Sequence, residues 1–143
     1  MIRNDELQAA LIARLKANTT ITPLLASGTY ADETWERDIR EDQWQGTTFA
    51  YPNVRVKLLP STPLGDRECP HIRFSVSFLV FSESGSSLEA DQIAGIINNE
   101  LHGKTFTSNS IVISLRLGSL IPAVRSGERA WRSETLMNGI ASG

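Results

Sequence analysis

Three residues carry side chains that favour transition metals, but their spacing does not suit a metal site. Cys69, His71 and His102 are the only cysteine and histidines of the chain. A structural zinc site uses four ligands in closely spaced pairs, whereas this chain offers one pair and one distant histidine. The single cysteine also excludes an internal disulfide. We therefore expect no bound metal and no cofactor.

The triplet Gly103-Lys104-Thr105 has the letters that end a nucleotide-binding loop. The first glycine of that motif would fall at position 98, which is an asparagine. A phosphate loop also precedes a helix, so that the helix N-terminus meets the anion, but this triplet follows a predicted helix. The sequence favours a simple turn that ends the helix.

Catalytic side chains are not arranged in a pattern typical of an enzyme. No serine lies in a Gly-x-Ser-x-Gly turn that would expose a nucleophile. The densest group of carboxylates is Asp32, Glu33, Glu36, Asp38, Glu41 and Asp42. With Arg37 and Arg40, these six acids give a local charge of −4, and the segment has a solvated composition that would not separate two pKa values. We expect no enzymatic activity, with a small hydrolase as the weakest alternative.

The composition is typical of a globular protein outside the membrane. Hydrophobic residues make up 41% and charged residues 21% of the 143 residues, a length that fits one domain. A formal net charge of −2 provides no basic footprint for nonspecific binding of nucleic acid. No apolar run approaches the roughly 18 residues of a membrane-spanning helix. Residues 1–6 lack the pattern of a signal peptide, so we expect synthesis in the cytoplasm and no membrane partner.

The elements that would position these side chains begin with a strand and a helix between positions 71 and 101. Apolar residues alternate with polar ones in the first part, which predicts a strand with one apolar face. Its apolar positions are Ile72, Phe74, Val76, Phe78 and Val80. A Gly- and Ser-containing break follows, and then a helix over 88–101 whose apolar residues are spaced by three and four. Its apolar stripe is Ala90, Ile93, Ala94, Ile97 and Leu101.

Similar patterns predict the remaining elements. A helix is expected over 5–17, capped by Asn4, and Thr22 before Pro23 predicts a short helical turn. The first helix buries Leu7, Ala10, Leu11 and Leu15. Strands are expected over 53–59 and 110–120, the second with a bulge or bend at Gly118. Residues 61–70 and 122–128 are expected as a loop and a turn.

The last predicted strand, over 130–137, has a weak apolar face. We therefore expect it at a sheet edge or completed by a neighbouring molecule. Ser86 and Glu89 have the spacing of a capping box for the second helix. The order of elements predicts an α+β fold, a mostly antiparallel sheet with two main helices packed on one face, in a single domain over 1–143.

Residues 29–50 form an irregular segment that is both aromatic and acidic. Tyr30, Trp35, Trp44 and Phe49 lie among its charges, and aromatic residues are favoured at the buried centres of interfaces. One interpretation is a segment that anchors a contact with another chain. The other is a pair of short strands, over 28–35 and 47–51, that fold over the protein's own core.

Arginines gather near the end of the sequence. They are Arg116, Arg125, Arg129 and Arg132, with Glu128 and Glu134 between them. One interpretation is a rim that meets the acidic 32–42 segment of a neighbouring subunit, because complementary charge fixes register between subunits. The other is a set of solvated arginines. Charge reversal at Arg129 and Arg132 separates the two, since assembly would change only in the first case.

With these elements placed, the chain resembles the tail terminator or tail completion proteins of long-tailed bacteriophages. The resemblance lies in the helix over 6–16, in Tyr51-Pro52-Asn53-Val54 opening a strand, and in Phe78-Leu79-Val80-Phe81-Ser82 with Gly85 leading into the helix over 90–101. It spans most of the chain with motifs at the level of pattern. It implies a small α+β subunit, without cofactor or catalytic residues, in a ring that is typically a hexamer.

The resemblance also implies a place and partners. The ring would lie in the virion at the head-proximal end of the tail tube, binding the tube protein and the head-tail connector. Sheet edges and the 29–50 segment would supply the two unlike surfaces that a ring requires. Trp35, Trp44 and Phe49 would be interface anchors, and Arg129 and Arg132 register contacts. The 32–42 acids would face the lumen and repel DNA in transit.

Other functions remain open. The nearest is a different neck or tail component, such as a head-tail connector or a tube protein. A nucleic-acid-binding α+β domain is a further alternative, but it requires exposed aromatic residues flanked by basic ones on adjacent strands. Phe74, Val76 and Phe78 are expected in the core instead.

Overall fold

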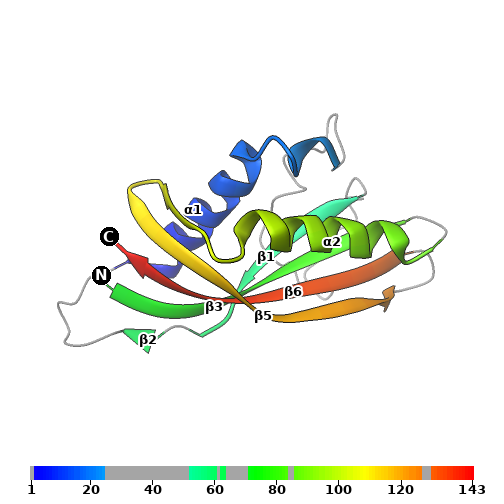
Figure 1. Ribbon diagram of the computed structural model, residues 1–143. Helices are drawn as coiled ribbons and strands as arrows, with labels where there is room; N and C mark the ends of the chain where they lie inside the picture. The colour runs from blue at the N-terminus through cyan, green and yellow to red at the C-terminus, as the bar shows by residue number, and fades with distance from the viewer. Residues whose placement is uncertain (1, 25–51, 61, 64–70, 84–85, 127–129) are drawn as a thin grey trace, which may run out of the picture.

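The computed structural model describes residues 2–24, 52–60, 62–63, 71–83, 86–126 and 130–143 (Figure 1). Its helices are α1 (Asn4–Ala17), the 3₁₀ turn η1 (Thr22–Leu24) and α2 (Leu88–Leu101). Its strands are β1 (Asn53–Leu58), β2 (Thr62–Pro63), β3 (His71–Ser82), β4 (Thr105–Ser108), β5 (Ile111–Ser126) and β6 (Ala130–Ser142). The strand pairs are antiparallel, which confirms the predicted α+β fold class.

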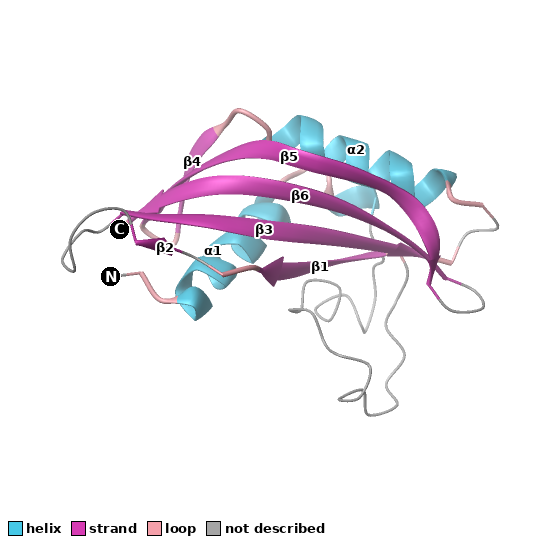
Figure 2. Ribbon diagram, turned by 90° about the horizontal axis from the view of Figure 1, so that it is seen from below, coloured by secondary structure: helices cyan, strands magenta, loops and turns pink. Residues whose placement is uncertain are grey.

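The described strands form one curved sheet with both main helices on the same side. The strand order is β1-β3-β6-β5-β4, and β2 pairs with β3 beside β1. Helix α2 lies over β3, β6 and β5, while α1 lies over β1 and β4. Figure 1 shows the two helices above the sheet, and Figure 2 shows the sheet from its other side, with the helices behind the strands.

The hydrophobic core lies between the sheet and the helices, as the alternation predicts. Phe74 and Phe78 of β3 are fully buried there, together with Met137 of β6. The predicted stripes of both helices are buried as well, which confirms them residue by residue. Gln8 of α1 donates to the carbonyl of Val56 at 2.8 Å, and Ser108 of β4 donates to the carbonyl of Ala10 at 2.7 Å.

Strand β6 lies in the middle of the sheet, so the prediction of an edge strand is wrong. It pairs with β3 along one side and with β5 along the other, and it runs to Ser142. Its inward positions include Ser133 and Thr135, which are buried and donate to the carbonyls of Ala90 and Ala94 in α2. The sequence shows a weak apolar face because these buried positions hold hydroxyl residues. The hydroxyls are tolerated there because carbonyl oxygens of the closely packed helix accept hydrogen bonds from them.

Strand β5 also continues past its predicted end. It runs through Pro122 to Ser126, where a turn was expected. Register shifts against β6 fall between Leu117 and Ser119 and between Ile121 and Val124. The first confirms the predicted bulge at Gly118. The second accommodates Pro122, because a proline fits a strand at a bulge or an outer edge.

Two short strands and the helix caps differ from the expectations. Strand β2 lies in the segment predicted as a loop, and β4 begins at the last residue of the predicted Gly103-Lys104-Thr105 turn and continues where no element was predicted. At two and four residues these strands are too short to show a period. The N-cap of α1 is Arg3 rather than Asn4, with the Arg3 N–H donating to Glu6 at 3.1 Å. The predicted capping box of α2 is absent because Glu89 accepts instead from the Ser82 hydroxyl at 2.8 Å.

Candidate interface on the open face of the sheet

Most of the predicted contact residues lie outside the described residues. These are Trp35, Trp44, Phe49 and Arg129, and the acids Asp32, Glu33, Glu36, Asp38, Glu41 and Asp42. Both proposed short strands of the 29–50 segment fall there too, so the choice between the two interpretations of that segment stays a prediction. Of the predicted contacts, the structure places Arg132 on the central strand β6.

Arg132 lies on the face of the sheet that points away from the helices. Successive residues of a strand point to opposite faces, and the neighbouring Ser133 is buried against α2. Arg132 is exposed and lies opposite Phe81 of β3 and Val124 of β5. We name this side of the sheet the open sheet face, since no described helix covers it (Figure 2).

The open sheet face is strongly basic. By the same alternation, its charged residues within the described strands are Arg55, Lys57, Arg73, Arg116, Arg132 and Glu134. Glu134 accepts a hydrogen bond from the Ser77 hydroxyl at 2.6 Å. Arg73, Arg116 and Arg132 form no ion pair with any residue of the described ranges. Three guanidinium groups are therefore available to a partner.

Apolar side chains are exposed among these arginines. Val112, Ile121, Val124 and Ile140 belong to the same face by register, and their side chains are 42%, 41%, 48% and 44% exposed. Interface centres are enriched in arginine and apolar residues and depleted of lysine and glutamate. The open sheet face thus has the composition of a surface that contacts another protein.

The predicted arginine cluster is divided between two faces. Arg116 and Arg132 lie on the open sheet face, whereas Arg125 pairs with Trp131 on the side of the helices. The Arg125 guanidinium stacks over the Trp131 ring at 5.3 Å from its centroid. The sequence could not assign these arginines to faces, because the second bulge shifts the alternation between Ile121 and Val124.

Aromatic rings are not displayed on the open sheet face. Phe74 and Phe78 lie in the core, as expected. Phe81 is on the open side but is buried, and the Arg55 guanidinium lies 4.3 Å from its ring centroid. Stacking of single-stranded bases needs accessible rings. Within the described part of the chain, this face offers positive charge but no accessible aromatic ring on which a base could stack.

Side chains bind backbone groups of β1 and of the part of β5 that extends beyond β4. Along β5, beyond its pairing with β4, the N–H of Leu117 donates to His102 Nδ1 at 2.8 Å and that of Ala123 donates to Asp91 at 2.9 Å. Pro122 has no N–H to offer. Gln8 binds a carbonyl of β1 at the opposite edge, as described above. Strand addition at these edges is therefore disfavoured.

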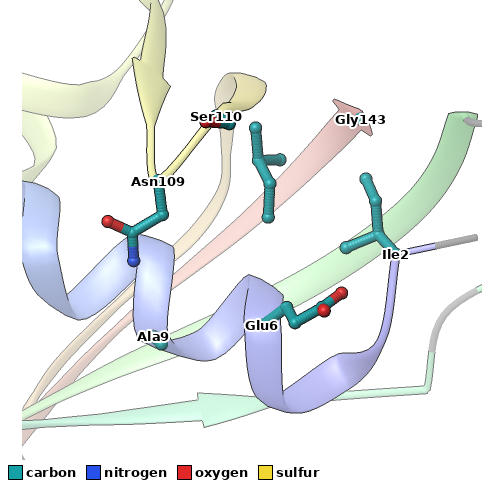
Figure 3. Close-up of a pocket in the computed structure, with 7 residues that line it drawn as sticks. Ile2, Glu6, Ala9, Asn109, Ser110 and Gly143 are labelled. Carbon is teal, nitrogen blue, oxygen red and sulfur yellow. The ribbon is translucent and has the colours of Figure 1, made fainter.

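A pocket of about 480 Å³ lies at one end of the molecule, between the start of α1 and the β4–β5 turn (Figure 3). Glu6, Asn109 and Ser110 supply its polar groups, and Ile2 covers one side. The Glu6 carboxylate already caps α1, and the hydrogen bond from Arg3 lowers the pKa of Asp5 below its ordinary value. No hydrogen bond joins the Ser110 hydroxyl to the Glu6 carboxylate, so the described lining shows no pair of nucleophile and base.

A second hollow runs along the outer side of α2. It has a volume of about 590 Å³ and is lined by Leu24, Glu89, Asp91, Gln92, Ile93, Gly95, Ile96 and Asn99. We name it the α2 groove. The charged side chains among its described lining residues are Glu89 and Asp91, both acidic, and α2 contains no lysine or arginine. Neither carboxylate forms an ion pair with a residue in the described ranges, and each accepts a hydrogen bond from a neutral donor.

Among the described residues, no three histidine, cysteine, aspartate or glutamate side chains gather in a way that could hold a metal ion. None of the described helices is long and apolar enough to span a membrane.

Comparison with known proteins shows the fold and no family. No family model and no curated protein matches the sequence. A chain from the virion of a native gene transfer agent particle shares the fold with a TM-score of 0.66, covering 96% of this chain and 95% of that chain at 16% identity. A second solved structure has a TM-score of 0.58, with 17% identity over 100% of this chain and 97% of that chain.

Proposed function

We propose that this chain is a structural virion protein, specifically a tail terminator that forms a ring and caps the tail tube. Its work would be adhesive and steric, without catalysis and without a cofactor. The ring, typically of six copies, binds the last ring of tube protein, blocks further addition and presents a docking face to the head-tail connector. DNA passes through its lumen without specific binding.

The whole-length fold likeness to a chain of a gene transfer agent virion carries this proposal. Because it covers 96% of this chain and 95% of that chain, the shared architecture extends well beyond a common motif. The surface agrees with an assembly role. Unpaired arginines and exposed β-branched residues share the open sheet face, a combination that favours contact with protein.

Deletion of the coding sequence from the replicon that carries it tests the terminator role. We expect tubes of uncontrolled length and heads without joined tails in electron micrographs of the lysate, because nothing would stop tube addition or dock the connector. Complementation with the intact chain should restore joined particles. Loss of all tails would indicate a tube protein instead, and normal tail length with unjoined heads would indicate a connector.

Nucleic-acid binding is the second candidate, because the open sheet face carries five basic residues and one carboxylate within the described strands. Phosphate contacts depend on such charge and weaken steeply with salt. A filter-binding measurement at low salt with single- and double-stranded DNA tests it. We expect only weak retention that moderate salt abolishes, since the face displays no accessible aromatic ring.

A further inference from the structure

We propose that the open sheet face of one copy docks on the α2 groove of a second copy. The contact deepens the ring proposed above and rests on it. The part of the face that docks consists of Ile121, Val124 and Arg132, which we name the distal patch. The occupant is a second copy of this chain because the two surfaces complement each other in charge and in apolar character.

Charge complementarity is the first argument. Arg132 is exposed and unpaired among the described residues, and its partner surface carries Glu89 and Asp91 with no basic residue on the same helix. Each of these carboxylates uses one oxygen for a neutral donor and keeps the other. A guanidinium placed beside them would gain the strongest hydrogen bonds that either group can make.

Apolar surface is the second argument. Ile121 and Val124 are exposed near Arg132 on the open sheet face, and the groove offers Leu24, Ile93 and Ile96 as a floor. Gly95 lies in this floor, in the middle of an α-helix. A Cβ there would meet no described atom within 4 Å. Folding therefore does not require glycine at this position, and its absent side chain leaves room for another chain.

The position of the two surfaces explains why the partner must be another copy in a head-to-tail arrangement. The distal patch lies on the side of the sheet that faces away from the helices, whereas the residues that line the α2 groove belong to η1 and α2. Figure 1 shows both main helices on one side of the sheet, so the two surfaces of one molecule cannot meet. Two open sheet faces cannot pair with each other, because arginine would oppose arginine. A contact between unlike surfaces closes into a ring or continues as a filament.

Strand addition at the edges of the sheet is the competing arrangement. Side chains bind backbone groups of β1 and of the part of β5 that extends beyond its pairing with β4, and Pro122 interrupts that part of β5. A neighbour could pair with these edges only by displacing those bonds. Contact through the face leaves them intact.

A mixing experiment with two variants tests the contact. Arg132→Glu destroys the patch and keeps the groove, whereas Gly95→Lys blocks the groove and keeps the patch. In sedimentation velocity at low salt we expect the wild type to self-associate, each variant alone to weaken association at least about tenfold, and an equimolar mixture to form a dimer but nothing larger. The dimer joins the intact patch of one variant to the intact groove of the other.

Controls keep the result interpretable. Ala17→Lys adds the same charge at an exposed position of α1 outside both surfaces and should associate like the wild type. Arg132→Gln should weaken association less than Arg132→Glu, and circular dichroism verifies that each variant folds. A monomeric wild type at its highest soluble concentration, unchanged association of Gly95→Lys, or a mixture without dimer overturns the contact. The deletion phenotype is independent of these outcomes, so each proposal can fail separately.

Discussion

Two neighbouring residues in the β4–β5 turn adopt a backbone conformation that L-residues avoid. Asn109 and Ser110 have φ angles of 50° and 65° in a two-residue loop, the geometry for which Asn-Gly is the preferred pair. Asparagine tolerates this region because its short side chain bonds locally, whereas serine gains no described hydrogen bond there. Ser110 therefore stores strain at the mouth of the pocket in Figure 3.

Replacing Ser110 with glycine should stabilise the protein. Relief of the Cβ clash outweighs the greater freedom of glycine in the unfolded chain, and we expect a gain of about 0.5 kcal/mol or more in the free energy of unfolding. Urea denaturation monitored by circular dichroism measures it. Ser110→Ala keeps the Cβ and should leave stability nearly unchanged, so an equal gain with alanine would contradict the explanation.

Two glycines should respond oppositely to alanine. At Gly139 in β6, a Cβ would lie 2.6 Å from Phe74 Cζ and 2.8 Å from the Ser114 carbonyl oxygen. Gly139→Ala should therefore lower the free energy of unfolding by about 2 kcal/mol. Gly95→Ala should raise it by up to about 1 kcal/mol, because alanine favours a helix and meets nothing there. Thermal and urea melts of both variants check the two signs together.

These residues also show where sequence alone is insufficient. The alternation of β3 predicts its buried side correctly because large apolar residues occupy every second position. In β6 the corresponding positions hold Ser133, Thr135 and Gly139, so the same face carries little hydrophobic signal. Their fit depends on helix carbonyls and on the Phe74 ring, which come from distant parts of the sequence. No local pattern contains that information.

At the scale of elements, one carboxylate ties α2 to the far end of β5. Asp91 in the first turn of α2 accepts from the Ala123 N–H at 2.9 Å, just past the proline that interrupts the strand. The bond holds the outer part of the β5–β6 hairpin against the helix layer. It thereby fixes the distal patch relative to the α2 groove within one subunit.

Asp91→Ala should loosen the hairpin locally. We expect the Ala123 amide to exchange with solvent faster by a factor on the order of ten, because it loses a charged acceptor. Hydrogen exchange followed by NMR measures this amide directly. Asp91→Asn keeps an acceptor oxygen and should retain most of the protection, while amides in the centre of β3 should be unaffected by either change.

Elements with a clear apolar period or a specific turn signal could be predicted from the sequence, whereas the shortest strands and the full length of the interrupted strand could not. Both helices, η1, β1 and β3 follow from periodicity and from the proline at position 23. The predicted strand ended before the observed end of β5, because Pro122 indicates a turn when the bulge beside it is not known. The polar sides of β1, β3 and β5 already contained the arginines of the open sheet face. Summing them across strands required the order of strands, which the sequence does not provide.

At the scale of the whole molecule, charge is separated between opposite sides. The described open sheet face is basic, and the outer side of α2 is acidic, although the net charge of the chain is only −2. In the proposed contact such a distribution would orient two copies before they touch, and it is hidden in the overall composition. The net charge of −2 excludes a protein that is basic overall, but it gives no information on how charge is divided between the faces of the sheet and helices.

Self-association should weaken with salt. Screening shortens the Debye length from about 10 Å at 0.1 M to about 3 Å at 1 M, so the attraction between unlike faces falls while apolar contact remains. We expect the wild-type dissociation constant to rise steadily with sodium chloride in sedimentation equilibrium. Arg132→Gln should show a shallower dependence. A salt-independent constant would mean that the association is apolar and does not use these charges.

The strand order constrains when a subunit becomes competent. Strands β1 and β3 come early and β4 and β5 come late, yet β6 alone joins the two groups. Without β6, the described strands form two groups that do not pair with each other. The arginines of β3 and β5 share one surface only because β6 lies between those strands. We therefore expect a chain that ends before β6 to lack the open sheet face and to be unable to dock through it.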